Sequence, residues 1–112
     1  MLYGVVDIGS NTVRLNVYRH ENNNINVMFS KKETLGLVFY IKNRKLTNEG
    51  IKKLVAVLKE IKEDLEYFKI KNYRFFSTAS LRNIENRGEV IEIIEDQVAI
   101  EIDVLSGEEE GL

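Results

Sequence analysis

The sequence predicts one α/β domain whose elements follow the order βββ, α, β, α, β. Three observations lead to this fold class. Segments of β-type residues fill the first third of the chain, an amphipathic helical segment fills the middle, and a strand, a helix and a strand follow. The 112 residues have the size of a single domain. We therefore expect a mixed five-stranded sheet whose later strands join in parallel through right-handed crossovers.

The first third of the chain is predicted to be an antiparallel meander. Residues 2–8 are apolar and β-branched, as in a buried central strand, and only Asp7 departs from that pattern. A Gly-Ser-Asn turn follows, and residues 12–18 then alternate between apolar and polar side chains. The polar residues 21–24 form a second turn, which leads into a third strand at 25–31.

The middle of the chain is predicted to contain one long helix. Residues 33–45 place a glycine within an apolar and aromatic run, so strand, loop and short helix all remain open there. Thr47 is a suitable N-cap with Gly50 three residues later. Apolar residues then recur at spacings of three and four: Ile51, Leu54, Val55, Leu58, Ile61, Leu65 and Phe68. The charged residues on the other face, such as Glu60 and Lys62, are expected to be solvated.

The last third is predicted to add a strand, a helix and a strand. Residues 73–77 form a short strand, and residues 84–96 carry apolar side chains at helical spacing, although Gly88 weakens the first turn. Residues 99–105 are strand-like. Residues 106–110 are expected to be a turn that leads into a third helix.

Composition excludes several classes of function. Sixteen basic and eighteen acidic residues give a formal charge of −2, so no global field attracts nucleic acid or a membrane surface. The chain has no cysteine and a single histidine, His20, which excludes disulfides, thiolate sites and histidine metal clusters. The N-terminus resembles a strand rather than a signal peptide. A cytoplasmic protein is expected.

The turn after the first strand is a candidate phosphate site. The sequence Asp-Ile-Gly-Ser-Asn brings backbone N–H groups and small polar side chains together, as phosphate cradles do, and Asp7 could hold Mg²⁺. An ordinary hairpin turn has the same composition. Two further polar clusters follow predicted strands, at residues 77–82 and 106–110. Since ligands collect at the carboxyl ends of strands in α/β sheets, the three clusters together favour a binding site.

Three segments of the chain resemble one known family. They are VVDIGSNTVRLNVY at 5–18, FSTASLRNIEN at 76–86 and IEIDVLSGEEEGL at 100–112. Their sequences and spacing are similar to the motifs of the exopolyphosphatase/guanosine pentaphosphate phosphohydrolase family, within the superfamily of sugar kinases, heat-shock chaperones and actin. Two departures are Gly111 in place of the usual alanine and the lack of a basic residue beside the Leu-Gly pair in segment 34–46.

The resemblance implies a ribonuclease H-like fold and an incomplete active site. Members of the family have two ribonuclease H-like domains facing a cleft, and residues 1–112 match the first domain only. We therefore expect the chain to be the N-terminal lobe of a hydrolase, to be nearly inactive alone, and to form a homodimer through exposed cleft surface. The implied cofactor is Mg²⁺.

The resemblance also implies roles for individual residues. Glu110 matches the catalytic acidic residue that orients or deprotonates the attacking water, and Asp7 would help to bind the metal. The expected phosphate-binding residues are Gly9, Ser10, Asn11, Thr12 and Arg82. The implied substrates are inorganic polyphosphate or guanosine pentaphosphate, with no nucleic acid polymer and no membrane as partner.

Two other classes of function share part of this pattern. The domain could be a module that binds phosphate or a nucleotide without catalysis, or that self-associates. A sugar or acyl kinase of the same superfamily is disfavoured, because such enzymes lack the Ser-Gly-x-Glu-Glu motif found at 106–110.

Overall fold

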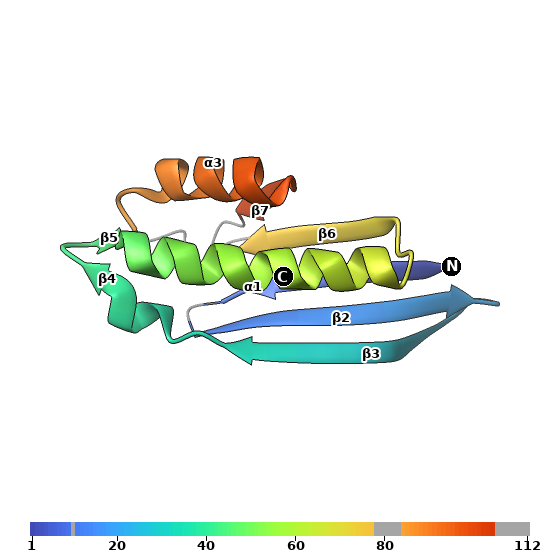
Figure 1. Ribbon diagram of the computed structural model, residues 1–112. Helices are drawn as coiled ribbons and strands as arrows, with labels where there is room; N and C mark the ends of the chain where they lie inside the picture. The colour runs from blue at the N-terminus through green and yellow to red at the C-terminus, as the bar shows by residue number, and fades with distance from the viewer. Residues whose placement is uncertain (10, 78–83, 105–112) are drawn as a thin grey trace.

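The protein is built on a five-stranded mixed sheet with the strand order β3-β2-β1-β6-β7. The computed structural model describes residues 1–9, 11–77 and 84–104. The described elements are β1 (Leu2–Ile8), β2 (Thr12–Glu21), β3 (Asn24–Thr34), the 3-10 helix η1 (Leu37–Tyr40), β4 (Ile41–Lys42), β5 (Lys45–Leu46), α1 (Asn48–Tyr67), β6 (Asn72–Ser77), α3 (Arg87–Val98) and β7 (Ile102–Val104). Figure 1 shows their arrangement. The α/β class and the mixed five-stranded sheet are confirmed.

The meander forms as predicted, with longer strands. β1 pairs antiparallel with β2 and parallel with β6, so it is the central strand. Asn22 and Asn23 both have positive φ, 50° and 66°, which makes the connection between β2 and β3 a tight two-residue turn. His20 consequently lies within β2 rather than in a turn, and it is exposed.

The segment left open at residues 33–45 contains all three kinds of structure. β3 continues to Thr34, η1 follows Gly36, and β4 begins a two-stranded ribbon with β5. Gly36 has φ of +62°. The chain can turn there without steric penalty, because glycine has no Cβ.

Helix α1 begins and packs as its sequence predicts, except at its end. The Thr47 side chain accepts a hydrogen bond from the Gly50 backbone N at 3.3 Å, which caps the helix. The predicted apolar stripe is buried from Ile51 to Leu65, whereas Phe68 is the C-cap and is 50% exposed. The stripe ends one turn earlier than predicted because the chain leaves the helix there.

The last elements differ from prediction in their bounds. α3 ends at Val98, and Ala99 is its C-cap, with φ of +60°. The strand predicted from Ala99 therefore starts at Ile102, while Leu105 lies outside the described residues. Lys62 of α1 donates hydrogen bonds to the carbonyls of Val98 and Ala99 at 3.1 and 2.8 Å, so it neutralises the end of α3 rather than being solvated.

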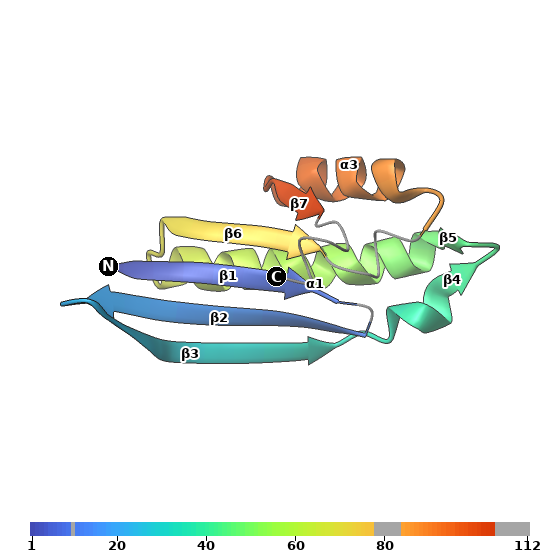
Figure 2. The ribbon, with the colours of Figure 1, turned by 180° about the vertical axis from the view of Figure 1, so that it is seen from behind.

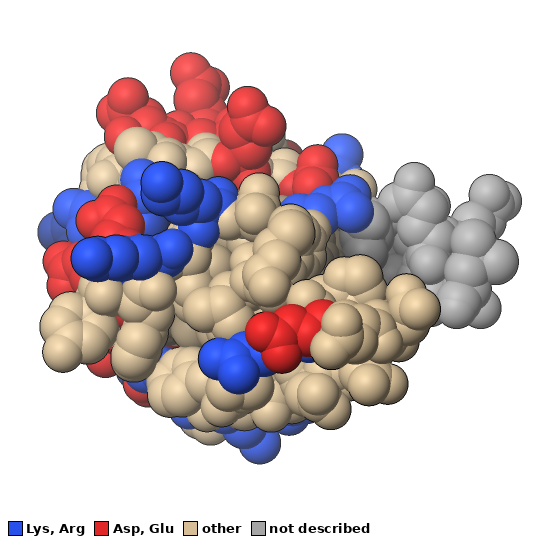
Figure 3. All heavy atoms as spheres, turned by 90° about the vertical axis from the view of Figure 1, so that its right-hand side faces the viewer, with Lys and Arg blue, Asp and Glu red and all other residues tan. Residues whose placement is uncertain are grey.

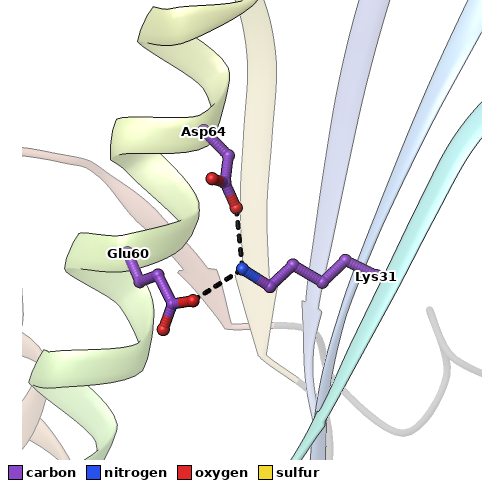
Figure 4. Close-up of polar contacts among 3 residues, drawn as sticks. All are labelled: Lys31, Glu60 and Asp64. Atoms are coloured by element: carbon purple, nitrogen blue, oxygen red, sulfur yellow. Dashed lines mark hydrogen bonds and ion pairs between the residues drawn. The ribbon is translucent and has the colours of Figure 1, made fainter.

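The edge strand β3 is attached to α1 by one lysine. Lys31 Nζ lies 2.8 Å from Glu60 Oε1 and 2.9 Å from Asp64 Oδ2 (Figure 4). Hydrogen bonds from its ammonium to Glu60 and then Asp64 raise the pKa of Lys31 well above its usual range. Glu60, whose side chain is 55% exposed, is thus solvated as expected and also pairs with the sheet.

The helices cover one face of the sheet. α1 lies in front of the strands in Figure 1 and behind them in Figure 2. Its buried stripe and the buried residues of α3 share one core with the alternate strand residues Val6, Ile8 and Phe75, each at most 2% exposed. Across the part of the chain that the structure describes, no helix is long and apolar enough to span a membrane.

Candidate functional site

Three strands end side by side at one edge of the sheet. In the parallel register, Ile8 at the end of β1 lies opposite Ser77 of β6, and Ser77 lies opposite Val104 of β7. The segments that follow these residues are the three polar clusters singled out in the sequence. Their starting points are therefore neighbours, as expected for a ligand site at the carboxyl ends of strands.

Asp7 lies on the face of the sheet away from the helices. Its neighbours in β1, Val6 and Ile8, are fully buried, whereas Asp7 is half-buried and lies opposite Arg14 of β2 and Phe76 of β6. One carboxylate oxygen, Oδ1, is enclosed. The alternation of a strand explains how an acidic residue fits in an otherwise apolar segment. β1 is the central strand as predicted, and in the described residues only the face toward the helices is fully buried.

The turn after β1 is held by backbone hydrogen bonds. Gly9 N donates to Thr12 O at 2.8 Å, and a Cβ at Gly9 would lie only 3.2 Å from that oxygen. The carbonyl of Asn11 accepts hydrogen bonds from Leu35 N at 2.6 Å and Gly36 N at 3.1 Å. The turn is thereby fixed to the end of β3 and the start of η1. A fixed turn keeps its groups ready for a ligand without further ordering.

The other predicted site residues lie outside the described residues. They are Ser10 in the turn, Arg82 after β6 and Glu110 after β7. The structure therefore locates Asp7, Gly9, Asn11 and Thr12 around one strand end, and the roles of all these residues stay predictions.

Two basic residues beside Asp7 were not predicted. Arg14 lies directly across from Asp7, and Lys32 of β3 lies across from Arg14, both of them exposed. Each cation comes from a different strand, so only the strand register places Arg14 next to Asp7 and Lys32 one strand further on the same face. The alternation of buried and exposed residues in β2 could have indicated Arg14, because it places Arg14 on the face opposite Val13 and Leu15.

The described residues fit Mg²⁺ in one particular mode. Among residues 1–9, 11–77 and 84–104, no group of three or more acidic, histidine or cysteine side chains could hold a metal alone. Mg²⁺ commonly takes one or two carboxylates and completes its shell with water and substrate phosphates. Asp7, beside a turn rich in N–H groups, suits that mode.

The fold and the strand-end turn define a class: an α/β domain with a mixed five-stranded sheet whose candidate site lies at the carboxyl ends of its strands. The sequence matches the Ppx/GppA phosphatase family over residues 16–112, and the chain belongs to that family.

Characterised relatives are longer than this chain. Exopolyphosphatase 1 of Mycobacterium tuberculosis is 31% identical over 113 residues, which cover 99% of this chain and 33% of the relative. The guanosine-5′-triphosphate,3′-diphosphate pyrophosphatase of Vibrio cholerae is also 31% identical, over 98% of this chain and 22% of the relative. The chain thus spans a third or less of both relatives.

Solved structures share the fold. A Ppx/GppA family member from Aquifex aeolicus superposes with a TM-score of 0.92 and 25% identity, over 99% of this chain and 37% of that one. An exopolyphosphatase from Cytophaga hutchinsonii superposes with a TM-score of 0.89 over 96% of this chain and 35% of that one; at 24% identity it supports the fold alone.

Proposed function

We propose that this chain is the N-terminal lobe of a magnesium-dependent hydrolase that cleaves terminal phosphoanhydride bonds of inorganic polyphosphate or guanosine pentaphosphate. One observation carries the proposal: in a chain of the Ppx/GppA family, Asp7 lies at the carboxyl end of the central strand together with Gly9, Asn11 and Thr12, whose backbone groups are held by hydrogen bonds. The names of the two relatives, an exopolyphosphatase and a guanosine phosphate pyrophosphatase, support both substrates.

In this proposal each part of the chain has a distinct task. The turn residues Gly9, Ser10, Asn11 and Thr12 and the guanidinium of Arg82 bind the terminal phosphate. Arg14, across from Asp7, adds positive charge on the same face. Glu110 orients the attacking water and takes its proton.

Asp7 would hold Mg²⁺, which when bound neutralises charge on the phosphoryl oxygens. Metal dependence has its own measurement, because Asp7→Asn should raise the Mg²⁺ concentration needed for half-maximal activity. An unchanged Mg²⁺ requirement would exclude Asp7 as a ligand.

Catalysis is expected only when a second lobe completes the cleft, because positioning the phosphate and the water requires groups from both sides. The 112-residue chain alone should release no phosphate from polyphosphate with Mg²⁺, whereas a longer protein containing it should. Turnover by the chain alone at about 1 per second, an ordinary enzyme rate, would contradict the two-lobe proposal.

The roles of Glu110 and Arg82 are separable in that longer protein. Glu110→Gln should lower kcat by about 100-fold or more with little change in KM, because the carboxylate acts on the water. Arg82→Ala should raise KM as well, since it removes a ligand of the bound phosphate. Glu109→Gln is the matched control for the acidic run. Full activity of Glu110→Gln together with loss of activity in Glu109→Gln would show that the catalytic carboxylate is Glu109 and not Glu110.

The homodimer and the cytoplasmic location stay predictions. Exposed apolar side chains lie at both ends of the molecule: Phe39 of η1, toward the end where the cleft is expected, is 83% exposed, and Met1, Ile25 and Tyr67 at the other end are 67%, 68% and 80% exposed. Figure 3 shows the end with Met1 as a largely uncharged surface that has charged side chains both around it and within it. Light scattering of the chain at high concentration tests self-association, and a clean monomer would contradict the dimer.

A further inference from the structure

The ribbon of β4 and β5 concentrates positive charge at its tip. Lys42, Arg44 and Lys45 are three cations within four residues, and all are exposed. The chain as a whole carries a net charge of −2. Within the described residues, the ion pairs involve Lys31 and Arg74, and none includes a cation of the ribbon tip. The tip is therefore a local positive centre on a mildly acidic protein.

Two features of the ribbon are unfavourable by themselves. Lys42 and Lys45 are direct cross-strand partners, and like charges opposite one another destabilise a strand pair. Between them, Asn43 and Arg44 have φ of 53° and 64°. A two-residue turn with both φ values positive prefers glycine at its second position, where this chain has Arg44.

Positive φ alone does not mark a functional position, because Lys69 also adopts it, at the end of α1. The ribbon differs in that both unfavourable choices add a cation to the same tip. An anionic ligand at the tip would offset the repulsion between the lysines. Such a conflict between local structure and sequence is typical of binding sites.

The ribbon is held both at its turn and at its base. Arg44 O accepts a hydrogen bond from Glu85 N at 2.7 Å. The Asn86 carboxamide accepts from Leu46 N and donates to Leu46 O, both at 3.0 Å, in the manner of a strand partner. The backbone of the ribbon is therefore ordered before any ligand binds, which reduces the entropy lost on binding.

The ribbon lies at the same end of the molecule as the phosphate turn. Figures 1 and 2 both show it beyond the carboxyl ends of β1 and β6. The connection between them is short, since Asn11 O accepts hydrogen bonds from Leu35 N and Gly36 N, and the four residues of η1 lead directly into β4. Four residues of 3-10 helix rise about 8 Å. A linear chain of phosphates that starts at the turn could thus extend to the ribbon.

We propose that Lys42, Arg44 and Lys45 bind the distal phosphates of a linear polyphosphate whose terminal phosphate lies at the Gly9–Thr12 turn. This inference rests on the proposed function and selects the long linear substrate from the two candidates. A nucleic acid strand also offers repeated phosphates, but the acidic outer surface of α3 and the net negative charge disfavour its broader footprint.

The test measures binding of long-chain polyphosphate to the 112-residue chain as a function of salt. The combined variant Lys42→Gln, Arg44→Gly, Lys45→Gln should bind it about 10-fold or more weakly, and the slope of log affinity against log salt should fall by about one per lost contact. Tripolyphosphate, too short to reach the ribbon from the turn, should bind equally to both proteins.

The matched control is Lys69→Gly, which removes one exposed cation and relieves one non-glycine residue of a positive φ at the opposite end of the molecule. It should leave polyphosphate binding unchanged, whereas Arg44→Gly should weaken it. Both single variants should keep or raise the melting temperature, since glycine relieves the backbone at each site. Loss of binding by Arg44→Gly with an unchanged melting temperature therefore cannot be attributed to unfolding.

Three results would overturn the inference: equal binding of long polyphosphate by wild type and the combined variant, no binding by wild type, or a stronger ribbon-dependent preference for a single-stranded oligonucleotide. The proposed hydrolase is decided separately, by phosphate release from the longer protein with Mg²⁺. If the longer protein hydrolyses polyphosphate but the ribbon variants bind it as well as wild type, only this inference is wrong. If the ribbon variants bind polyphosphate more weakly but the longer protein does not hydrolyse it, polyphosphate binding is supported and the proposed hydrolase function is wrong.

Discussion

The two faces of the sheet are made from alternate residues of the same strands, yet they differ in burial and in charge. On the covered face, Val6, Ile8 and Phe75 pack under the helices and are at most 2% exposed. On the open face, Asp7 lies across from Arg14, and Arg74 forms an ion pair with Asp103 whose side chains are both about half exposed. The buried core and the proposed metal ligand therefore lie on opposite faces of one strand, a single residue apart.

The largest expected effect comes from two neighbouring substitutions on β1. Ile8→Ala removes a fully buried side chain from the covered face and should lower the free energy of unfolding by about 2–5 kcal/mol. Asp7→Asn on the open face keeps the shape of the side chain and should change it by less than about 1 kcal/mol. In the longer protein the same Asp7→Asn should lower phosphate release by about 100-fold.

Urea unfolding followed by circular dichroism checks the stability of both variants of this chain. If Asp7→Asn destabilised the fold as much as Ile8→Ala, the carboxylate would be part of the structural core, and the division between the faces would fail.

Local patterns in the sequence predicted what depends on local structure. The spacing of apolar residues and Thr47 located α1, and the motif around Asp7 located the candidate phosphate turn, because neither depends on distant parts of the chain. Alternation also indicated two distinct faces in β2. It could not show that the described helices cover only one face of β1, since an apolar central strand has the same composition in both cases.

The sequence pattern did not predict features that depend on distant pairing or on unusual residues at positive φ. Arg14 is adjacent to Asp7 only through the register of the hairpin. Ala99 ends α3 in a conformation that usually requires glycine, so its residue type gave no sign of a helix end. The ribbon arises where a glycine in an apolar run had left the structure open, and the two positive φ values at its turn belong to Asn43 and Arg44 rather than to Asn-Gly.

A smaller effect is expected where the covered face leaves no room. A Cβ at Gly4 would lie 2.8 Å from Leu65 Cδ2 and 3.3 Å from Tyr73 Cβ. Gly4→Ala should therefore destabilise the chain by about 1–3 kcal/mol, because the buried Leu65 side chain has to leave its packed position. Gly88→Ala is the matched control, since nothing lies within 4 Å of a Cβ there and alanine favours the helix by up to about 1 kcal/mol. Melting curves that show Gly4→Ala as neutral would mean that the helix layer is loosely packed.

The smallest expected effect compares two adjacent lysines of β3. Lys31 bonds to Glu60 and Asp64 on the covered side, whereas Lys32 lies across from the like-charged Arg14 on the open side. Lys31→Met should cost about 0.5–1.5 kcal/mol, because it removes both ion pairs while keeping the length of the side chain. Lys32→Met should be neutral or slightly stabilising, since it removes a like-charge pair.

The pH dependence of the Lys31 variant identifies the origin of its effect. Because the pKa of Lys31 is raised by folding, the stabilisation that it provides is fully present below the lysine pKa of the unfolded chain, about 10.4. It is lost as the pH rises above that value towards the folded pKa. The difference in unfolding free energy between wild type and Lys31→Met should therefore be constant from about pH 7 to 9.5 and shrink above about pH 10.4, as measured by urea unfolding. A difference that stays constant up to pH 11 would show that Lys31 acts through the packing of its aliphatic stem, and the ionic contact between β3 and α1 would then contribute nothing to stability.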